Sequence, residues 1–356
     1  MTSIVNVTWL TGFEGSSSAA IVEPDRVVLV TDRRYEETAR ALSSPDVEVA
    51  LVSQTYDETL VELIARRPGA TGYEAAHLSA QRLRWLTAAL HAVRWPAESN
   101  FRPTLDVIEA GRIVKDDWEI ARLRDAARRV SAVLTGVLAD LAAGQRESDV
   151  AQALEAGLRR TGAQKPAFDT IVASGPRSAL PHGRAATRML EAGDLVVLDF
   201  GGVYGGYCVD LTRTVELAPR TVEAGRVHEA VAEAQRAAIA AIRPGISFTE
   251  ADRAARAVLE KAGLADRFVH GTGHGLGLEV HEAPRLGPAR SPASAGPPLP
   301  GTVTMPETFA PGMVVTVEPG VYIPGWGGVR IEDDVLVTAG GAERLTDVPV
   351  TLASGD

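Results

Sequence analysis

Two segments of equal length and similar character recur in this sequence about a hundred residues apart. Gly144–Gly162 (GQRESDVAQALEAGLRRTG) and Gly245–Gly263 (GISFTEADRAARAVLEKAG) each indicate an Ala/Leu-rich helix that ends at a glycine, with Ser148 and Thr249 as candidate N-caps. Each segment follows a longer Ala-rich helical stretch and precedes Gly-rich sequence of β character. The repeat predicts a domain of two similar α-then-β halves, with a functional site at the seam between them.

The first half contains a hairpin that carries two acidic residues. Leu195–Val215 (LVVLDFGGVYGGYCVDLTRTV) has the pattern of a strand, a Gly-rich turn and a second strand. If the turn is centred between Tyr204 and Gly205, Asp199 and Asp210 lie directly opposite each other. Two carboxylates about 5 Å apart repel by roughly 3 kcal/mol at an effective dielectric constant of about 20. Because apolar residues flank both, a cation is expected between them.

The second half repeats this arrangement. In Met313–Val337 (MVVTVEPGVYIPGWGGVRIEDDVLV), a turn through Pro324–Trp326 places Glu318 opposite Glu332. One such acid on its own is more often an ordinary strand-end or turn carboxylate. Four acids paired in two apolar hairpins carry a charge of about −4, which two divalent cations would neutralise. The two hairpins therefore predict a dinuclear metal site.

Histidines and glycines are concentrated in one short stretch. His270–Glu282 (HGTGHGLGLEVHE) contains His270, His274 and His281 among glycines that let the backbone approach a ligand closely. Neutral imidazole can bind a metal or carry a proton near neutral pH, although a single histidine of this kind is more often structural. A fourth residue, His182, is a weaker candidate for the same site. The chain has no zincin, dinucleotide-binding, phosphate-loop or serine-hydrolase motif.

Length and composition restrict the class of protein further. The chain has 356 residues, enough for two domains, and a formal net charge of −10, which argues against nucleic acid and against an anionic membrane as partners. Cys208 is the one cysteine, so neither an intramolecular disulfide nor a cysteine-based zinc site can form. The sequence has no apolar run long enough for a membrane span and no secretory-type start, and we expect a cytoplasmic protein.

The first third of the chain has a different pattern from the rest. Short apolar strands are predicted within residues 18–32 and at Val47–Val52, and helical periodicity is found at Tyr56–Ala65 and Leu78–Val93. A long amphipathic helix follows at Trp118–Leu141. These elements predict an α/β domain that ends near residue 110.

Taken together, these residues resemble the Xaa-Pro aminopeptidases and prolidases of the pita-bread metallopeptidase family. The similarity extends from Trp9–Ser16 (WLTGFEGS) to Arg330–Asp333 (RIED) and so spans nearly the whole chain. It implies a creatinase/prolidase-like α/β domain over residues 1–110. Residues 111–356 would then form an α+β pita-bread catalytic domain with an internal pseudo-two-fold duplication.

The resemblance also assigns roles to individual residues. It implies two divalent metal ions per chain, with Asp210 and Glu332 as the bridging carboxylates of a five-residue ligand set: Asp199, Asp210, His274, Glu318 and Glu332. Manganese is favoured for this oxygen-rich set, with cobalt and zinc as alternatives. The implied catalytic and substrate-binding residues are His182, His270, His281, Glu318 and Arg330, with Glu318 as the acceptor of a proton from water.

The activity implied is hydrolysis of the peptide bond before proline, in Xaa-Pro dipeptides or at the N-terminus of longer Xaa-Pro peptides, by a homodimeric enzyme. Two alternatives remain: a pita-bread peptidase for non-proline dipeptides, and a non-catalytic binding module of the same fold, which the intact ligand set disfavours. A proline-rich segment, residues 284–311, leads to a further hypothesis. It would overhang the metal site and limit substrate length, and deletion of Ser291–Pro300 would test this.

Overall fold

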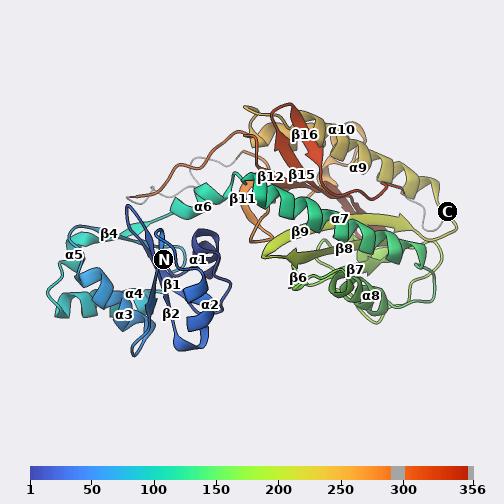
Figure 1. Ribbon diagram of the computed structural model, residues 1–356. Helices are drawn as coiled ribbons and strands as arrows, with labels where there is room; N and C mark the ends of the chain where they lie inside the picture. Colours follow the sequence, from blue (N-terminus) through green and yellow to red (C-terminus); the bar gives the residue numbers. More distant parts are fainter. Residues whose placement is uncertain (290–300, 352–356) are drawn as a thin grey trace. The chain divides into compact units, whose positions relative to one another are not determined.

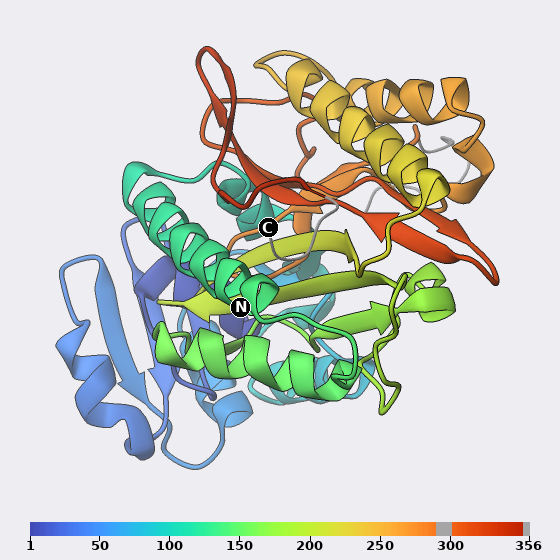
Figure 2. The same cartoon turned by 90° about the vertical axis from the view of Figure 1, so that its right-hand side faces the viewer.

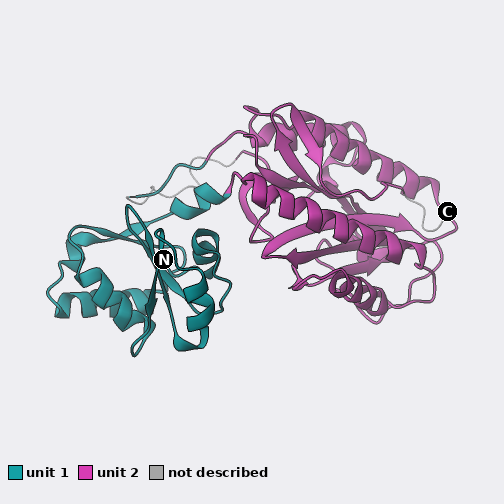
Figure 3. Ribbon diagram, viewed as in Figure 1, with its two compact units in different colours: residues 1–112, 291–305 teal, residues 113–290, 306–356 magenta. Residues whose placement is uncertain are grey.

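The computed structural model describes residues 1–289 and 301–351. The chain divides into two compact units, the first comprising residues 1–112 with 291–305 and the second residues 113–290 with 306–356 (Figure 3).

Unit 1 is built on a three-stranded sheet in the order β1-β2-β3 and a separate pair of parallel strands, β4 and β5 (Figure 1). The strands predicted within residues 18–32 and at Val47–Val52 are confirmed. The strands are β1 (Ala19–Val22), β2 (Val27–Thr31), β3 (Val47–Leu51), β4 (Thr71–Glu74) and β5 (Phe101–Thr104). The helices are α1 (Ile4–Thr11), α2 (Glu36–Ala41), α3 (Tyr56–Ala65), α4 (Ala80–Ala92), α5 (Ala97–Asn100) and α6 (Val107–Arg112).

Successive side chains along the strands of unit 1 point to opposite faces of the sheet, so the core of this unit has two layers. Ile21 and Val28 lie on the face that packs against Leu60 of α3, whereas Ala20 and Leu29 face the opposite way. Successive side chains of a strand point to opposite faces, so an apolar run such as β2 can fill both layers. Both faces of this sheet are therefore buried.

Unit 2 consists of two halves, each with a pair of helices and a set of strands (Figures 1 and 2). The first half contains α7 (Asp117–Ala139), α8 (Glu147–Arg160), β6 (Lys165–Pro166), β7 (Ile171–Ser174), β8 (Leu195–Tyr204) and β9 (Tyr207–Glu216). The second half contains α9 (Val222–Ala241), α10 (Phe248–Lys261), β10 (Gly273–Gly275), β11 (Glu282–Leu286), β12 (Val314–Val317), β13 (Gly320–Ile323), β14 (Gly327–Arg330), β15 (Asp333–Thr338) and β16 (Gly341–Arg344). This is the duplicated α-then-β organisation predicted from the repeat.

The candidate N-caps of the repeated helices were wrong. Ser148 and Thr249 each lie at the second residue of their helix, because α8 begins at Glu147 and α10 at Phe248. In α8 the backbone N–H groups of Glu147 and Ser148 donate to carbonyls of residues 188 and 186, at 3.0 Å each. The Phe248 N–H donates to the Glu307 carbonyl at 3.2 Å. Backbone groups distant in sequence therefore satisfy the first turns in place of a side-chain cap.

The register of the first hairpin also differs from the prediction. β8 and β9 pair Asp199 with Thr212 and Gly201 with Asp210, so Asp199 and Asp210 are diagonal rather than direct neighbours. The turn is centred one position later than expected, because Gly205 and Gly206 both adopt positive φ angles, 54° and 85°. A two-residue hairpin turn with positive φ at both positions favours glycine strongly. The two aspartates still lie on the same face of the hairpin.

The second hairpin agrees with its predicted register. β12 pairs with β15, ending at Val317 opposite Asp333, and β13 pairs with β14, beginning at Gly320 opposite Arg330. Both ladders continue a single register, in which Glu318 lies opposite Glu332 in the short gap between them. Both acids are thus placed where the strand pairing is interrupted.

Candidate metal site

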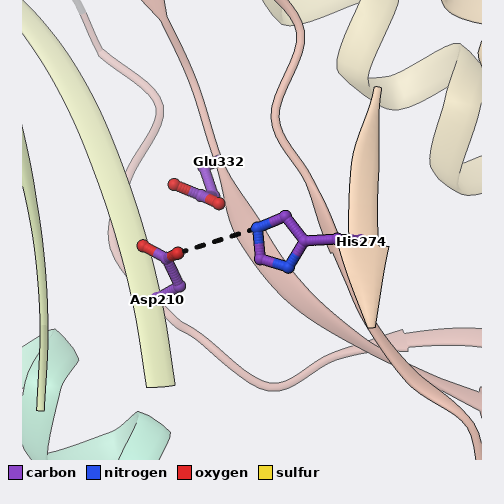
Figure 4. A group of neighbouring side chains, drawn as sticks. All are labelled: Asp210, His274 and Glu332. Carbon is purple, nitrogen blue, oxygen red and sulfur yellow. Dashed lines mark ion pairs between the residues drawn. The ribbon is translucent and has the colours of Figure 1, made fainter. Parts of the chain in front are cut away.

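Three buried side chains from separate segments of unit 2 converge at the seam between its halves. They are Asp210 of β9, His274 of β10 and Glu332, which directly precedes β15 (Figure 4). One ligand atom from each residue lies within 4.8 Å of the others, a spacing that a metal ion could bridge. Carboxylate and imidazole ligands of this kind suit a borderline or hard divalent cation.

The other two predicted ligands border the same cluster. Glu318 Oε1 lies 3.4 Å from His274 Nε2, and Asp210 Oδ2 lies 4.0 Å from the same nitrogen. Asp199 forms an ion pair with Arg330 through one carboxylate oxygen. Within the described part of the chain, Asp199 Oδ1 and Asp210 Oδ1 are buried with no hydrogen-bond partner. Two buried, unsatisfied carboxylate oxygens in an acidic cluster fit residues that hold cations.

The electrostatics of the cluster also favour a bound cation. Burial, together with the charges of neighbouring carboxylates, raises the pKa of Asp210 and that of Glu332 well above their ordinary values. Burial raises the pKa of Glu318 to about 7. Buried like charges of this kind are stabilised either by protonation or by a cation between them.

His274 presents a free nitrogen to the carboxylates. Its Nδ1 lies 3.0 Å from the Gly275 carbonyl and donates to it, which leaves the Nε2 lone pair directed at Asp210 and Glu318. Burial lowers the pKa of His274 to about 4, so the ring is neutral near pH 7. A Cβ added at Gly273 would lie 1.9 Å from the Thr316 carbonyl oxygen. Glycine is therefore needed for β10 to bring His274 into place.

Thr212 connects the two hairpins at the metal site. Its hydroxyl donates to Glu332 Oε2 at 2.6 Å, and the Glu332 N–H donates to the Thr212 carbonyl at 3.1 Å. Thr212 was not among the residues predicted from the sequence. The available signal was its position two residues after Asp210, on the same face of β9.

A chain of polar contacts links Asp199 to His270 through Arg330 and Tyr322. Arg330 is buried, and its NH1 donates to the Tyr322 hydroxyl at 2.8 Å. That hydroxyl lies 2.8 Å from His270 Nε2, while His270 Nδ1 lies 2.8 Å from the Gly271 carbonyl. Both ring nitrogens of His270 are thereby engaged, and burial lowers its pKa to about 4. Tyr322, four residues after Glu318, was not anticipated from the sequence.

His281 and His182 have more open surroundings. The His281 ring packs against that of His274 with centroids 4.3 Å apart, and burial lowers its pKa, with a further contribution from Arg285. His182 is exposed and lies in the segment after β7. Both border a cavity of about 1310 Å³ that all nine predicted site residues help to line. The cavity is large enough for a short peptide.

The segment proposed to overhang this cavity is only partly described. Residues 290–300, which include the whole Ser291–Pro300 stretch named for deletion, lie outside the described residues. The neighbouring Pro288, Ala289, Pro306 and Glu307 line the cavity. The hypothesis that this segment limits substrate length stays a prediction.

Comparison with known proteins now identifies the family. Residues 121–339 match the model of metallopeptidase family M24, and residues 1–114 match the creatinase/prolidase N-terminal domain. The chain belongs to metallopeptidase family M24. The chain is 37% identical to the uncharacterized peptidase YqhT of Bacillus subtilis, over 99% of this chain and 94% of that protein.

Solved structures extend the comparison. The Xaa-Pro dipeptidase from Bacillus anthracis has a TM-score of 0.88 and 35% identity, with 98% of this chain and 92% of the other covered. The X-Pro aminopeptidase from Thermotoga maritima has a TM-score of 0.85 and 32% identity, with 98% and 93% covered. The predicted fold class is confirmed: a creatinase/prolidase-type α/β domain followed by a pita-bread domain.

Membership of M24 has two further consequences. It makes the chain a metallopeptidase enzyme and implies divalent metal ions, in agreement with the acidic cluster. The alternative of a non-catalytic module is thereby disfavoured. Among the described residues, no helix is both long and apolar enough to cross a bilayer.

Proposed function

We propose that this enzyme is an exopeptidase that hydrolyses the peptide bond preceding proline in Xaa-Pro dipeptides or in short peptides with an N-terminal Xaa-Pro. The observation that carries the proposal is the convergence of four carboxylates and one imidazole in a buried M24 site. The names of the similar solved structures, an Xaa-Pro dipeptidase and an X-Pro aminopeptidase, supply the substrate class.

The five residues that would hold two divalent ions are Asp199, Asp210, His274, Glu318 and Glu332. Asp210 and Glu332, which lie with His274 in one cluster, would contribute to holding both ions. When bound, divalent cations supply Lewis acidity that polarises a scissile carbonyl and makes water a stronger acid. Manganese is the proposed metal because oxygen ligands predominate, with cobalt and zinc as alternatives.

Residues of this chain perform proton transfer, stabilise negative charge and position the other groups. Glu318, which lines the cavity, accepts the proton of the attacking water. His281 and His182, at the cavity wall, stabilise negative charge on the carbonyl oxygen and position the peptide. Arg330 and His270 hold Asp199 and Tyr322 in place through their hydrogen bonds.

Arg285 is the residue proposed to select substrates by length. It lines the cavity on β11, opposite His274 in the strand register, and is exposed. Among the described residues, no carboxylate lies within ion-pair distance of its guanidinium. A free guanidinium in a peptide-sized cavity suits the terminal carboxylate of a short substrate. We therefore expect the dipeptide to be preferred over longer peptides.

The proposal also covers the domain boundaries, the oligomeric state and the cellular location. The catalytic domain covers residues 111–356 and the N-terminal domain residues 1–110. The first stretch of the first compact unit ends at Arg112, close to this boundary, and residues 291–305 also belong to that unit. The enzyme acts as a homodimer, the commonest closed form of soluble oligomers. It works in the cytoplasm, where a single unpaired cysteine such as Cys208 stays reduced.

The test compares three substrates with Mn²⁺ present: an Xaa-Pro dipeptide, an Xaa-Pro-Yaa tripeptide and a dipeptide without proline. We expect the Xaa-Pro dipeptide to be cleaved fastest. Equal or faster cleavage of the dipeptide without proline would instead support the alternative, a dipeptidase for non-proline substrates. Arg285→Ala should reduce kcat/KM for the dipeptide by about 10-fold or more, while the amidated dipeptide, which lacks the carboxylate, should be affected much less.

A further inference from the structure

A loop of residues 175–185, the His182 loop, carries His182 to the cavity of the metal site. The loop leaves the sheet after Ser174, the last residue of β7, and Arg184 near its end forms an isolated bridge with Ile171. His182 lines the cavity and is exposed, and among the described residues no hydrogen bond or ion pair holds its ring. The position of this imidazole therefore depends on the backbone of the loop.

One buried carboxylate joins the two ends of the loop. It belongs to Glu147, the first residue of α8, whose exposed fraction is 0%. Glu147 Oε1 accepts from the Ser174 N–H at 2.8 Å and from the Ser174 hydroxyl at 2.7 Å. Glu147 Oε2 accepts from the Ala186 N–H at 3.0 Å. Ser174 directly precedes the loop and Ala186 directly follows it, so each oxygen of one side chain holds one end.

Arg177 connects the interior of the loop to the same carboxylate. Its Nε donates to Glu147 Oε2 at 3.1 Å, and its NH2 donates to the Arg184 carbonyl at 2.7 Å. Hydrogen bonds between charged groups are roughly twice as strong as those between neutral groups. The Glu147 carboxylate therefore holds the loop more tightly than an uncharged acceptor would.

The far side of the loop contacts β14 of the second half. The Ser178 hydroxyl accepts from the Gly328 N–H at 2.8 Å, and the Pro181 carbonyl accepts from Arg330 NH1 at 3.2 Å. Pro181 directly precedes His182. The loop is thus held by Glu147 at its base and by β14 beside His182, and a shift at the base would change the strain on the second contact.

The second half of unit 2 contains a similar arrangement around His270. Asp252 of α10 is 2% exposed and accepts from the N–H and the hydroxyl of Thr272, at 3.2 and 2.9 Å. It also accepts from Arg256 Nε at 2.7 Å, and Arg256 NH2 donates to the His270 carbonyl at 2.5 Å. In each half, a buried carboxylate on the shorter helix therefore holds a histidine-bearing segment through a hydroxyl residue and an arginine.

We propose that Glu147 is a positioning residue for catalysis, which holds His182 at the cavity wall by joining the two ends of the His182 loop. Glu147 is not among the described residues that line the cavity, so it acts through the backbone of the loop. A displacement of about 1 Å in an active site can reduce the rate about 10²-fold, so a distant contact can limit turnover. The proposal rests on the role of His182 in the proposed function.

Glu147→Gln tests the proposal in the full-length, Mn²⁺-loaded enzyme. An amide has one oxygen, so it can accept at only one end of the loop. We expect kcat/KM to fall about 10-fold to 100-fold, divided between kcat and KM in the same proportion as in His182→Ala. Mn²⁺ affinity, measured by calorimetry, should be unchanged. Glu155→Gln is the matched control and should have the kcat/KM of the parent, because it makes the same change on α8 at a residue without a hydrogen bond to the loop among the described residues.

The double variant Glu147→Gln/His182→Ala separates positioning from a general structural role. If Glu147 acts through His182, the double variant should have the kcat/KM of His182→Ala alone, because the group that Glu147 positions is absent. Arg177→Ala provides a second cycle at a side chain that is 33% exposed and so tolerates truncation better. It should show the same dependence on His182 with a smaller loss. Losses that multiply in both cycles would overturn the proposal, as would a His182→Ala variant with the kcat/KM of the parent.

Hydrogen exchange measures the loop without a substrate. The Ala186 amide and the Gly183 amide, which donates to the Leu180 carbonyl at 3.0 Å, should exchange about 10-fold or more faster in Glu147→Gln than in the parent. Unchanged exchange, or Mn²⁺ affinity that falls as far as activity, would also overturn the proposal. The kinetic cycles use whichever of the three test peptides the parent cleaves fastest. A failure of the Xaa-Pro preference would therefore leave them interpretable.

Discussion

Thr212 Oγ1 lies 2.6 Å from Glu332 Oε2, and this hydrogen bond joins the two halves of the catalytic domain at the metal site. Thr212 is opposite Asp199 in the first hairpin and also forms an isolated bridge with Glu332 of the second. One residue therefore sets the position of carboxylates from both hairpins. Because a hydrogen bond to a ligating carboxylate fixes its orientation, Thr212 should matter for metal binding without being a ligand itself.

Thr212→Val tests this relationship. The substitution keeps the shape of the side chain and removes the hydroxyl, so we expect metal affinity to fall about 10-fold to 100-fold. Titration calorimetry with Mn²⁺ measures the change. Thr212→Ser is the matched control, since it retains the donor and should stay within about 3-fold of the parent affinity. Equal affinity in the Val variant would show that the bond does not orient Glu332.

Glu318→Gln separates proton transfer from metal binding. The amide keeps an oxygen toward the site but cannot accept a proton, so turnover should fall about 10²-fold to 10⁴-fold. Elemental analysis should still find metal bound. A variant with near-parent activity would remove Glu318 from the role of base, whereas loss of the metal would reveal a mainly structural ligand.

Lys115 and Glu282 form a buried ion pair next to His281. Lys115 Nζ lies 2.6 Å from Glu282 Oε1, and the two side chains are 1% and 8% exposed. Lys115→Met removes the cation and should destabilise the protein by about 3–5 kcal/mol, because the Glu282 carboxylate stays buried. The double variant Lys115→Met/Glu282→Gln should recover much of that loss. Denaturant unfolding measures both, and an additive double variant would show that the two residues are not coupled.

His228 of α9 gives stability a dependence on pH that is separate from the metal site. It is 6% exposed, and burial lowers its pKa to about 4 from an ordinary 6.5. Between these pH values the unfolded chain binds a proton that the folded chain does not, so stability falls as pH drops from 6.5 to 4. The full loss is on the order of 3 kcal/mol.

His228→Gln removes this titration. The stability difference between parent and variant, measured by urea unfolding at several pH values, should therefore change through the window from 6.5 to 4 and be constant above it. Other titrating groups are common to both chains and cancel in the difference. A difference that does not vary with pH would mean that His228 is not buried in its neutral form.

Much of the site could be predicted from local sequence. The alternation of acids with apolar residues in 195–215 and 313–337 placed the carboxylates on two hairpins, and the glycines around His274 indicated a close backbone approach. Periodicity suffices for such features because one or two strands determine them. The predicted register of the first hairpin was wrong because the turn is centred one position later than expected. Gly205 and Gly206, both with positive φ angles, decide where the turn lies.

The sequence by itself determined which residues can act here: four carboxylates on two hairpins, one imidazole between glycines, and a duplicated domain to carry them. Only the tertiary structure decided which of them meet. Thr212 contacts Glu332 across more than a hundred residues, Tyr322 engages His270, and backbone carbonyls rather than Ser148 complete the first turn of α8. These contacts depend on how the two halves pack, and local periodicity specifies the face of each strand but not its distant neighbour.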